Sequence, residues 1–522
     1  MDTSIINLWP ESAAFPLLTT LTLIPLITTI AIICSHSSTI ALRFGFTGAS
    51  LAVMLSIYLL IVFDTGNPGI HLVEQVHFAG FSYSVGVDGT NILFIPLTTV
   101  LTFLALVYTL ITRHVTDKLF IACLLGYETI LIGAFAALNV MQFWLWTLLE
   151  LIPVVLLTVN AGTGQNRRWV VTLLLQYWGS GLAMTLVGFL FLAFGLVGSD
   201  HDLTFDWLTL KENNAYLHDE TLIFILLFFG FSIRMPLFPF HGWLPLLAEH
   251  GTVASVAIFL VGLKLGIYAL IRFILPLLPG IAEDWAGFVL TLGIISIFYG
   301  ALLALMQINI RRLLAFAVIS HTGMLVIGIF CFNEYGLEGS LLLSIAYGLA
   351  TSGMLFSVGL IYERTRTAFI PRLGGLFDTN SSIALLFLIS ALSTMVMPGT
   401  PGFDAAHLLI EGVIEEDGWL IAIAILLGNV LAAAFLLRAF QQIFIATPKR
   451  FQQPYSSDHH PVRKERIITV IICLLLIGTG FYSTPWLDFI DQEATAIEKV
   501  YPIHGSQHPN KVTRPIDGNQ HE

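Results

Sequence analysis

The chain has 522 residues, of which 56% are hydrophobic and only 11% are charged. A soluble protein of this length is excluded, because its surface would need far more charge. The net charge of −11 does not indicate a nucleic-acid partner, since the acidic residues gather in a few loops and in the tail. Four widely spaced cysteines form no CxxC motif, so disulfides, zinc and iron–sulfur clusters have no support and we expect neither metal nor cofactor.

Fourteen apolar segments follow one another along the chain, each close to the roughly 20 residues that a membrane-spanning helix needs. They cover residues 15–34, 48–63, 91–112, 120–138, 140–159, 169–197, 221–241, 253–275, 286–306, 313–331, 340–362, 380–414, 419–446 and 467–486. The N-terminus lacks the basic region of a signal peptide, so the first segment is expected to remain as a span. The predicted fold class is therefore an all-α polytopic membrane protein with about 14 transmembrane helices.

The loops predict the orientation, because cytoplasmic loops are enriched in lysine and arginine. Basic residues follow the third, fifth, ninth, eleventh and thirteenth expected spans, which all end on one side: Arg113 and Lys118, Arg167 and Arg168, Arg311 and Arg312, Arg364, Arg366 and Arg372, and Lys449, Arg450 and Arg463 to Arg466. The alternate loops are acidic or neutral. Both termini are thus expected on the outer, periplasmic side, in agreement with an even number of spans.

Two of the expected spans stand out because closely spaced prolines interrupt them at membrane depth. The seventh is interrupted at Pro236 and Pro239, and the twelfth at Pro398 and Pro401. Proline removes a backbone donor and frees a carbonyl, which a bilayer tolerates only where protein or water satisfies these groups. Broken helices beside intramembrane charges are typical of ion sites in transporters.

The two breaks lie five spans apart, which predicts two five-helix units of inverted topology with an ion path between them. These units are residues 113–275, for helices 4–8, and 276–446, for helices 9–13. Residues 1–112 would form helices 1–3, and residues 447–522 helix 14 and a polar, poorly ordered tail. Because the units share no evident residue identity, this repeat rests on hydropathy and on the breaks.

Lys264 is the strongest candidate for proton chemistry, because it stands alone in the apolar eighth span. A charged side chain at the bilayer centre costs about 2.5–3.5 kcal/mol, so it normally faces protein or a water-filled path. An amine removed from water loses its proton more easily and can exchange it near neutral pH. The alternative is a structural lysine that pairs with a carboxylate.

Other charged residues of the first unit could assist Lys264. Arg234 stays protonated, so it is expected to hold a carboxylate, to fix a local field or only to anchor the helix break. Glu150 lies in an apolar span and could modulate Lys264 or accept a proton itself. Glu128 is a secondary candidate, expected nearer a membrane face.

Histidines and a second group of carboxylates extend the candidate list. His241 and His321 are possible relay residues, although a buried histidine with satisfied hydrogen bonds is the commoner case. Asp404, His407 and Glu411 crowd the second broken helix. The i,i+4 spacing places His407 and Glu411 on one face, where they could share a proton or form a solvated helix end.

Motifs for other chemistries are missing from the sequence. It contains no nucleotide-binding loop or nucleophile triad, and the His407–Glu411 pair is not an HExxH zinc motif. Asp88 and Gly89, in VGVDGTN, predict a turn that enters the third span.

Several segments together carry a family resemblance over roughly residues 15–490. They are RMPLFPFHGWLP, TVASVAIFLVGLKLGIYALIRF, ALMQINIRRLLAFAVISHTGM, GLATSGMLFSVGLIYERTRT, MPGTPGF and VGVDGTN. These look like the complex I subunit NuoM, which is NdhD in photosynthetic relatives and MrpD in cation/proton antiporters. The resemblance implies fourteen helices, two inverted five-helix repeats, and a mid-membrane chain of lysines, histidines and glutamates that moves protons.

The resemblance carries two of the family's titratable positions over unchanged. The helix-eight lysine matches Lys264, and the helix-ten histidine matches His321. The helix-seven lysine is Arg234 here, which keeps the charge but is less suited to proton exchange.

Three other family positions have lost their titratable or charged group. The helix-five glutamate falls at Leu148, with Glu150 two residues further on. The helix-eleven histidine falls at Tyr347, and the helix-twelve glutamate at Ala406, beside Glu411. A complete proton route of the usual kind is therefore not expected, which favours a divergent paralogue in a specialised complex.

These observations predict a proton-translocating membrane subunit of a larger complex, of the NADH:quinone oxidoreductase type, in a bacterial inner membrane. One alternative is the energising proton channel of an inorganic-carbon (CO2/bicarbonate) uptake complex with a DabA-like partner. A second alternative is a scaffold subunit whose proton path has decayed. A stand-alone redox or hydrolytic enzyme is disfavoured, because no ligand set or nucleophile is present.

Overall fold

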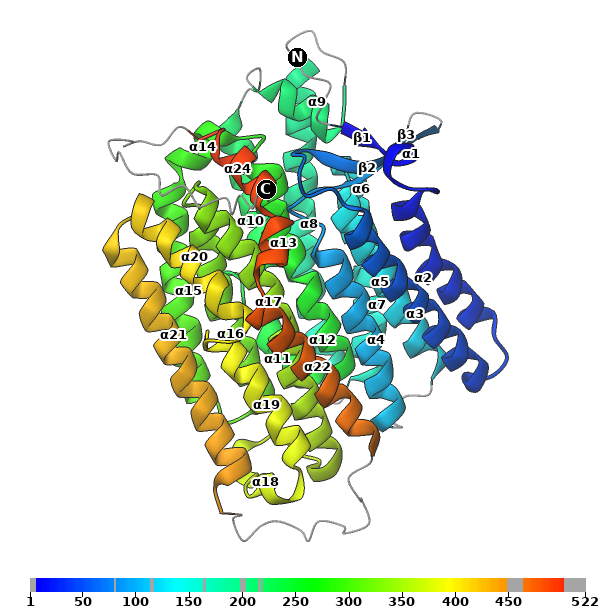
Figure 1. Ribbon diagram of the computed structural model, residues 1–522, viewed down its shortest axis with the longest axis vertical. Helices are drawn as coiled ribbons and strands as arrows, with labels where there is room; N and C mark the ends of the chain where they lie inside the picture. Colours follow the sequence, from blue (N-terminus) through cyan, green and yellow to red (C-terminus); the bar gives the residue numbers. More distant parts are fainter. Residues whose placement is uncertain are drawn as a thin grey trace, which may run out of the picture.

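The computed structural model describes residues 6–78, 81–112, 117–162, 166–197, 203–214, 217, 219–447 and 463–501. Figure 1 shows long helices side by side, with a small sheet at one end of the molecule. Within these ranges, 10 helical segments are long and apolar enough to cross a membrane. They are α2 (Leu17–Cys34), α3 (Ser38–Val62), α4 (Phe94–Thr112), α5 (Lys118–Ala136), α6 (Val140–Leu149) with α7 (Leu151–Ala161), α8 (Arg167–Val197), α15 (Ala286–Met306), α16 (Ile310–Ile329), α17 (Glu334–Thr365), and α21 (Trp419–Phe440) with η5 (Gln441–Ile445). The predicted polytopic, helical membrane protein is thereby confirmed.

The other expected spans are built from shorter pieces, except the last, α22, which has 19 residues and a charged first turn. These are α10 (Glu220–Arg234), α11 (Trp243–His250), α12 (Val253–Gly262), α13 (Lys264–Ala269), η3 (Leu270–Ile274), α19 (Ser381–Thr394), α20 (Pro401–Glu416) and α22 (Arg463–Phe481). α10 ends at Arg234, just before Pro236, and α20 begins at Pro401 after a turn that holds Pro398. The eighth expected span, in contrast, is interrupted without a proline, at Leu263, and a π-helical turn follows it.

The second span is longer than the sequence predicted. α3 begins at Ser38 rather than near residue 48, because Ser37 caps the helix and accepts a hydrogen bond from the Ile40 amide at 3.3 Å. The polar residues and Arg43 that shortened the predicted span lie within its first two turns. The helix therefore begins before the purely apolar segment of the sequence.

A small three-stranded sheet departs from the all-α prediction. It consists of β1 (Ile6–Leu8), β2 (Ile70–Phe78) and β3 (Phe81–Val87), with β1 parallel and β3 antiparallel to β2. The sequence predicts a loop at residues 64–90, where the structure has β2 and β3. Glu74 on β2 accepts hydrogen bonds from the amides of Leu18 and Thr19 at 2.8 and 2.9 Å, so the sheet caps the N-terminus of α2.

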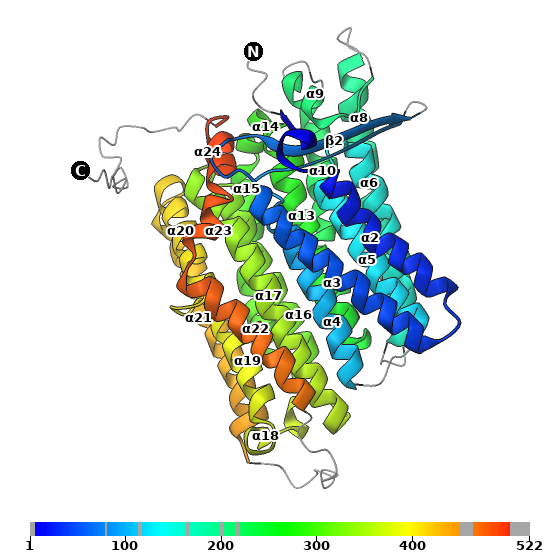
Figure 2. The same cartoon turned by 45° about the vertical axis from the view of Figure 1, so that its right-hand side comes forward.

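Several short helices cover the two ends of the bundle. They are α1 (Trp9–Ser12), α9 (Trp207–Glu212), α14 (Pro279–Asp284), η4 (Ile370–Arg372), α18 (Leu376–Thr379), α23 (Thr484–Asp488) and α24 (Asp491–Glu498). Both figures place β1 and α24 at the same end of the molecule, opposite α18 (Figures 1 and 2). The described ends of the chain therefore lie on one side of the bundle.

The first part of the C-terminal tail is ordered, contrary to the prediction. After α24, the Tyr501 hydroxyl donates a hydrogen bond to the Leu275 carbonyl at 2.6 Å, and its ring stacks on Phe332 at 4.4 Å. These contacts attach the tail to the ends of two central helices. Residues 502–522 lie outside the described part.

Arg311, which served as an orientation signal, is buried inside the protein. Its guanidinium donates to the Gly251 carbonyl at 3.3 Å and lies 4.4 Å from the centre of the Tyr362 ring. Arg364 forms an ion pair with Glu465, which ties α17 to α22. These arginines therefore also hold helices together. Arg113, Lys449 and Arg450 lie outside the described residues.

Candidate functional site

A buried ion pair connects the first broken helix to the fifth expected span. Glu150 lies at the junction of α6 and α7, is fully buried, and pairs with Arg234, the last residue of α10. The Tyr127 hydroxyl on α5 donates a hydrogen bond to the same carboxylate. The Arg234 guanidinium also donates to the Gly262 carbonyl at 3.0 Å and lies 4.1 Å from the Trp178 ring centre. Glu150 and Arg234, both predicted as site residues, thus form one cluster.

Gly262 is the residue that allows this cluster to close. A Cβ atom at this position would lie 2.0 Å from the Tyr127 hydroxyl oxygen and 2.7 Å from the Glu150 carboxylate. Any larger residue would therefore displace the ion pair. α12 ends here, with its last carbonyl directed at Arg234. Gly262 is not among the site residues predicted from the sequence, although its position two residues before Lys264 indicates a close approach of the backbone.

Lys264 begins α13 and lies in the protein interior, with only 6% of its surface exposed. It lines a small cavity together with His321 from α16 and with Tyr347 and Thr351 from α17. The rings of His321 and Tyr347 are stacked, with centroids 4.2 Å apart. Among the residues that the structure describes, the Lys264 amine has no hydrogen bond or ion pair with a side chain. The alternative of a lysine paired with a carboxylate therefore receives no support.

The ion pair and the cavity follow one another along the chain. Gly262 packs on Glu150 and Arg234, and Lys264, two residues later, lines the cavity beyond. Leu263 between them interrupts the helix. Glu150 pairs with Arg234 rather than with Lys264.

Two secondary candidates are buried but belong to neither group. Glu128 lies near the middle of α5, is fully buried, and neither carboxylate oxygen has a hydrogen-bond partner within the described ranges. Its depth relative to a membrane face stays a prediction. His241 lies in the turn between α10 and α11, where its ring packs against Phe238 and Tyr299 at 5.8 and 4.9 Å. Its aromatic contacts are those of a core histidine.

The second broken helix presents its titratable residues differently. Ala406, at the family's glutamate position, is buried, whereas the side chains of His407 and Glu411 are 71% and 46% exposed. The His407 Nδ1 and Glu411 Oε2 atoms are 3.7 Å apart, so the predicted pair does form. Asp404 accepts a hydrogen bond from the Ser483 hydroxyl at 2.5 Å, which ties α20 to the segment after α22. None of these side chains lines the Lys264 cavity.

A second buried ion pair, between Asp88 and Arg272, was not predicted. Asp88 forms the expected turn by accepting a hydrogen bond from the Thr90 amide at 3.0 Å. Arg272, in the π-helical turn η3, lies 4.0 Å from the centre of the Trp207 ring. Burial and the charge of Asp88 raise the pKa of the nearby Glu493, in the terminal helix α24, to about 7. These residues bring the end of β3, the turn η3 and the C-terminal helix α24 together.

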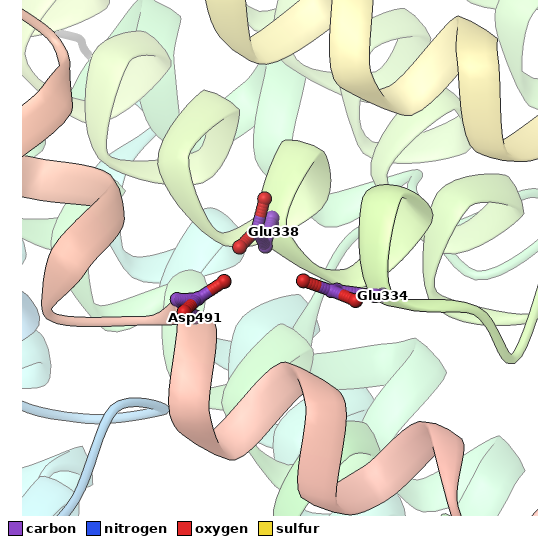
Figure 3. A group of neighbouring side chains, drawn as sticks. All are labelled: Glu334, Glu338 and Asp491. Carbon is purple, nitrogen blue, oxygen red and sulfur yellow. The ribbon is translucent and has the colours of Figure 1, made fainter. Parts of the chain in front are cut away.

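Three carboxylates also meet where α17 begins. Figure 3 shows Glu334 and Glu338 of α17 and Asp491 of α24, whose ligand oxygens lie within 4.8 Å of one another. Carboxylates suit hard cations, but a gathering of acids alone does not define a metal site. No sequence pattern predicts this group, because α17 and α24 are far apart in the chain.

The fold and the two interior groups define a class of protein: a polytopic membrane protein with broken helices beside buried charges, as in ion translocators. The chain belongs to the NADH:quinone oxidoreductase/Mrp antiporter transmembrane family, whose model matches residues 137–432. It is 32% identical over 490 residues to NAD(P)H-quinone oxidoreductase chain 4 1 of Picosynechococcus, covering 89% of this chain and 90% of the relative. It is 31% identical over 401 residues to NADH-quinone oxidoreductase subunit M of Rickettsia bellii, covering 76% and 80% respectively.

Solved structures agree with this assignment. A chain of respiratory complex I from Thermus thermophilus matches with a TM-score of 0.82 and 26% identity, covering 93% of this chain and all of that one. A chain of the Mrp complex from Dietzia matches with a TM-score of 0.81 and 17% identity, covering 93% and 99%. At that identity, the second match shows the fold alone. The predicted antiporter-like, M-type membrane subunit is confirmed.

Proposed function

We propose that the chain is a proton-translocating subunit of a larger energy-coupled complex in a bacterial inner membrane. The observation that carries the proposal is the buried Lys264 amine, which shares its cavity with His321 and Tyr347. An amine without a counter-charge can take up and release a proton without first breaking an ion pair. Histidine is the side chain best suited to exchange protons with it near neutral pH.

The Glu150–Arg234 pair would control this amine rather than carry protons through Arg234. The guanidinium stays protonated, so it acts as a fixed positive charge that Glu150 balances. If the pair opened, Arg234 would be left unbalanced close to the segment that bears Lys264. Repulsion between two nearby positive charges would then favour release of the Lys264 proton toward His321.

The proposed topology has fourteen helices, two inverted five-helix repeats at residues 113–275 and 276–446, and both termini on the outer side. The break between α10 and α11 and the break between α19 and α20 supply the paired interruptions typical of such repeats. The position of β1 and α24 at one end of the bundle supports an even number of spans.

Other membrane subunits are the proposed partners. The relatives named above are subunits of quinone oxidoreductases, and the matching solved chains come from complex I and from an Mrp complex. These matches favour a redox or antiporter assembly over a carbon-uptake assembly with a DabA-like partner. The scaffold alternative draws on Ala406 and Tyr347, which replace titratable groups, and it predicts that Lys264 is dispensable.

The decisive experiment replaces Lys264 with alanine and measures proton translocation of the assembled complex in membrane vesicles. We expect a loss of roughly 100-fold, the scale of a missing proton-transfer group, with normal amounts of protein in the membrane. Lys499→Ala, which removes an exposed lysine at the end of α24, is the matched control and should retain activity. Full activity of Lys264→Ala at normal expression would favour the scaffold alternative.

A further inference from the structure

A groove between α20 and α21 opens on the side of the molecule. Its polar lining consists of His407, Glu411 and Glu415 from α20 and Asn429 from α21, and its apolar wall includes Leu426 and Val430. Leu426 and Val430 are 48% and 63% exposed, and further exposed apolar residues continue along α21. This face therefore has the composition of a surface that lies within the bilayer.

The polar residues of the groove are unsuited to contact with lipid. Trp419, the first residue of α21 and 69% exposed, fits the position of an aromatic anchor at the outer interface. Glu411 lines the groove beside Leu426, about two helical turns further into α21. A charged side chain at membrane depth costs up to about 2.5–3.5 kcal/mol when it faces hydrocarbon. The Asn429 side-chain oxygen likewise has no hydrogen-bond partner among the described residues.

The charge of the groove is also one-sided. Two carboxylates, Glu411 and Glu415, line it, and the histidine His407 is its sole residue able to become positive. The His407 Nδ1 atom lies 3.7 Å from Glu411 Oε2 and can balance that carboxylate only when the imidazole is protonated. The groove therefore offers acceptors and negative charge to whatever covers it.

We propose that this groove is the docking surface for a membrane-spanning helix of a neighbouring subunit, which directs a lysine or arginine side chain at Glu411. A helix supplies the apolar surface that Leu426 and Val430 need, and a basic residue supplies a permanent positive charge opposite the two carboxylates. Anionic lipid headgroups would be repelled by the two carboxylates. A second copy of this chain with the same face would place like charges opposite one another.

This inference goes beyond the proposed function, because it names the face and the chemistry of the partner. It does not depend on proton transfer at Lys264, whose cavity is lined by other residues. A failure of one proposal is therefore distinguishable from a failure of the other.

The test places a photo-crosslinking benzoylphenylalanine at Val430 in the full chain, within native membranes that contain the complex. We expect an adduct with one other membrane protein, in a peptide from a spanning segment that contains lysine or arginine. Glu411→Lys should lower the adduct yield about tenfold or more, because like charges across an interface cost several kcal/mol. Asp284→Lys, a reversal at an exposed acid of α14 outside the groove, should leave the yield unchanged.

Three results would overturn the proposal. They are adducts with lipid alone, adducts with a second copy of this chain, and a mapped spanning segment without a basic residue. Glu411→Gln is a second variant for the case that Glu411→Lys fails to insert into the membrane. It should also lower the adduct yield while the protein reaches normal amounts in the membrane. An unchanged yield in Glu411→Gln would also contradict the predicted ion pair.

Discussion

The two broken helices look alike in sequence but have opposite arrangements of charge. At the first break, Arg234 turns inward to a fully buried Glu150, and Gly262 closes over the pair. At the second break, the inward position is Ala406, while His407 and Glu411 point to an open groove. Proline explains why both helices break, but it does not decide where the charges go.

This difference separates a buried charge pair from an exposed one, and the two proposals above give them different roles. A buried ion pair without further support is weak evidence for stability, because desolvation offsets the attraction between the charges. Its position beside the segment that bears Lys264 makes it more useful as a control element. The exposed pair on α20 is free to meet another subunit, and the inward face of that helix has become apolar.

The largest effect is expected from breaking the inner pair on one side. Glu150→Gln leaves the buried Arg234 guanidinium without its counter-charge, a change that typically costs about 3–5 kcal/mol. We expect a strongly lowered melting temperature of the purified protein together with loss of proton translocation. Combining it with Arg234→Met should restore much of the thermal stability but not the translocation. Recovery of both would show that the pair is structural.

The next effect concerns the glycine that packs against the pair. Gly262→Ala brings a methyl group to within 2.0 Å of the Tyr127 oxygen, and overpacking of this kind costs about 1–3 kcal/mol. We expect reduced translocation and lower thermal stability. Gly287→Ala on α15 is the matched control, since an added methyl group meets nothing within 4 Å there. Equal behaviour of the two variants would contradict the packing described for Gly262.

A smaller effect separates charge from shape at Arg234. Arg234→Lys keeps the positive charge, and the family resemblance places a lysine at this position, so activity should be largely retained. Arg234→Leu removes the charge and leaves the buried Glu150 without its counter-charge, so translocation should be lost. Proton translocation of both variants is measured in membrane vesicles. A leucine variant as active as the lysine variant would show that no positive charge is needed at position 234.

The outer pair should matter less than Lys264. Glu411→Gln is expected to lower coupled translocation only partly, because this side chain is 46% exposed and does not line the Lys264 cavity. Adding Ala406→Glu should restore part of the loss, since it returns a carboxylate to the buried side of α20. Translocation by the single and double variants would be compared at equal expression. A fully active Glu411→Gln protein would show that the route ends before α20.

The smallest effect is a pH dependence at the C-terminal segment. The pKa of Glu493 is raised to about 7 by burial and by Asp88, so its neutral form is favoured in the docked helix α24. Docking should therefore be strongest below the ordinary pKa of about 4.5 and weaken as the pH rises through 7. The hydrogen-exchange rate of the α24 amides, measured between pH 5 and 8, tests this dependence. Glu493→Gln should remove the dependence, and a pH-independent wild type would contradict it.

The sequence by itself determined the membrane class, the two proline breaks and the position of Lys264 inside an apolar span. These follow from local properties: apolar length, the missing donor of proline and the cost of an isolated charge in lipid. It also identified Glu150 and Arg234, although not as partners of one another. The hairpin of β2 and β3 and the ordered α24 were missed, because loops and tails reveal little until their long-range partners are known.

Only the tertiary structure decided which charges meet. Glu150 lies at a helix junction, so its direction depended on the local backbone rather than on a regular helical period. Gly262 shows its role only through the side chains packed against it, and Asp88 only through Arg272 on a distant helix. His407 and Glu411 have the spacing of a pair on any helix, but whether that face meets the core or the surroundings depends on how α20 packs on α17. Such contacts join residues far apart in the chain, so one-dimensional patterns could not fix them.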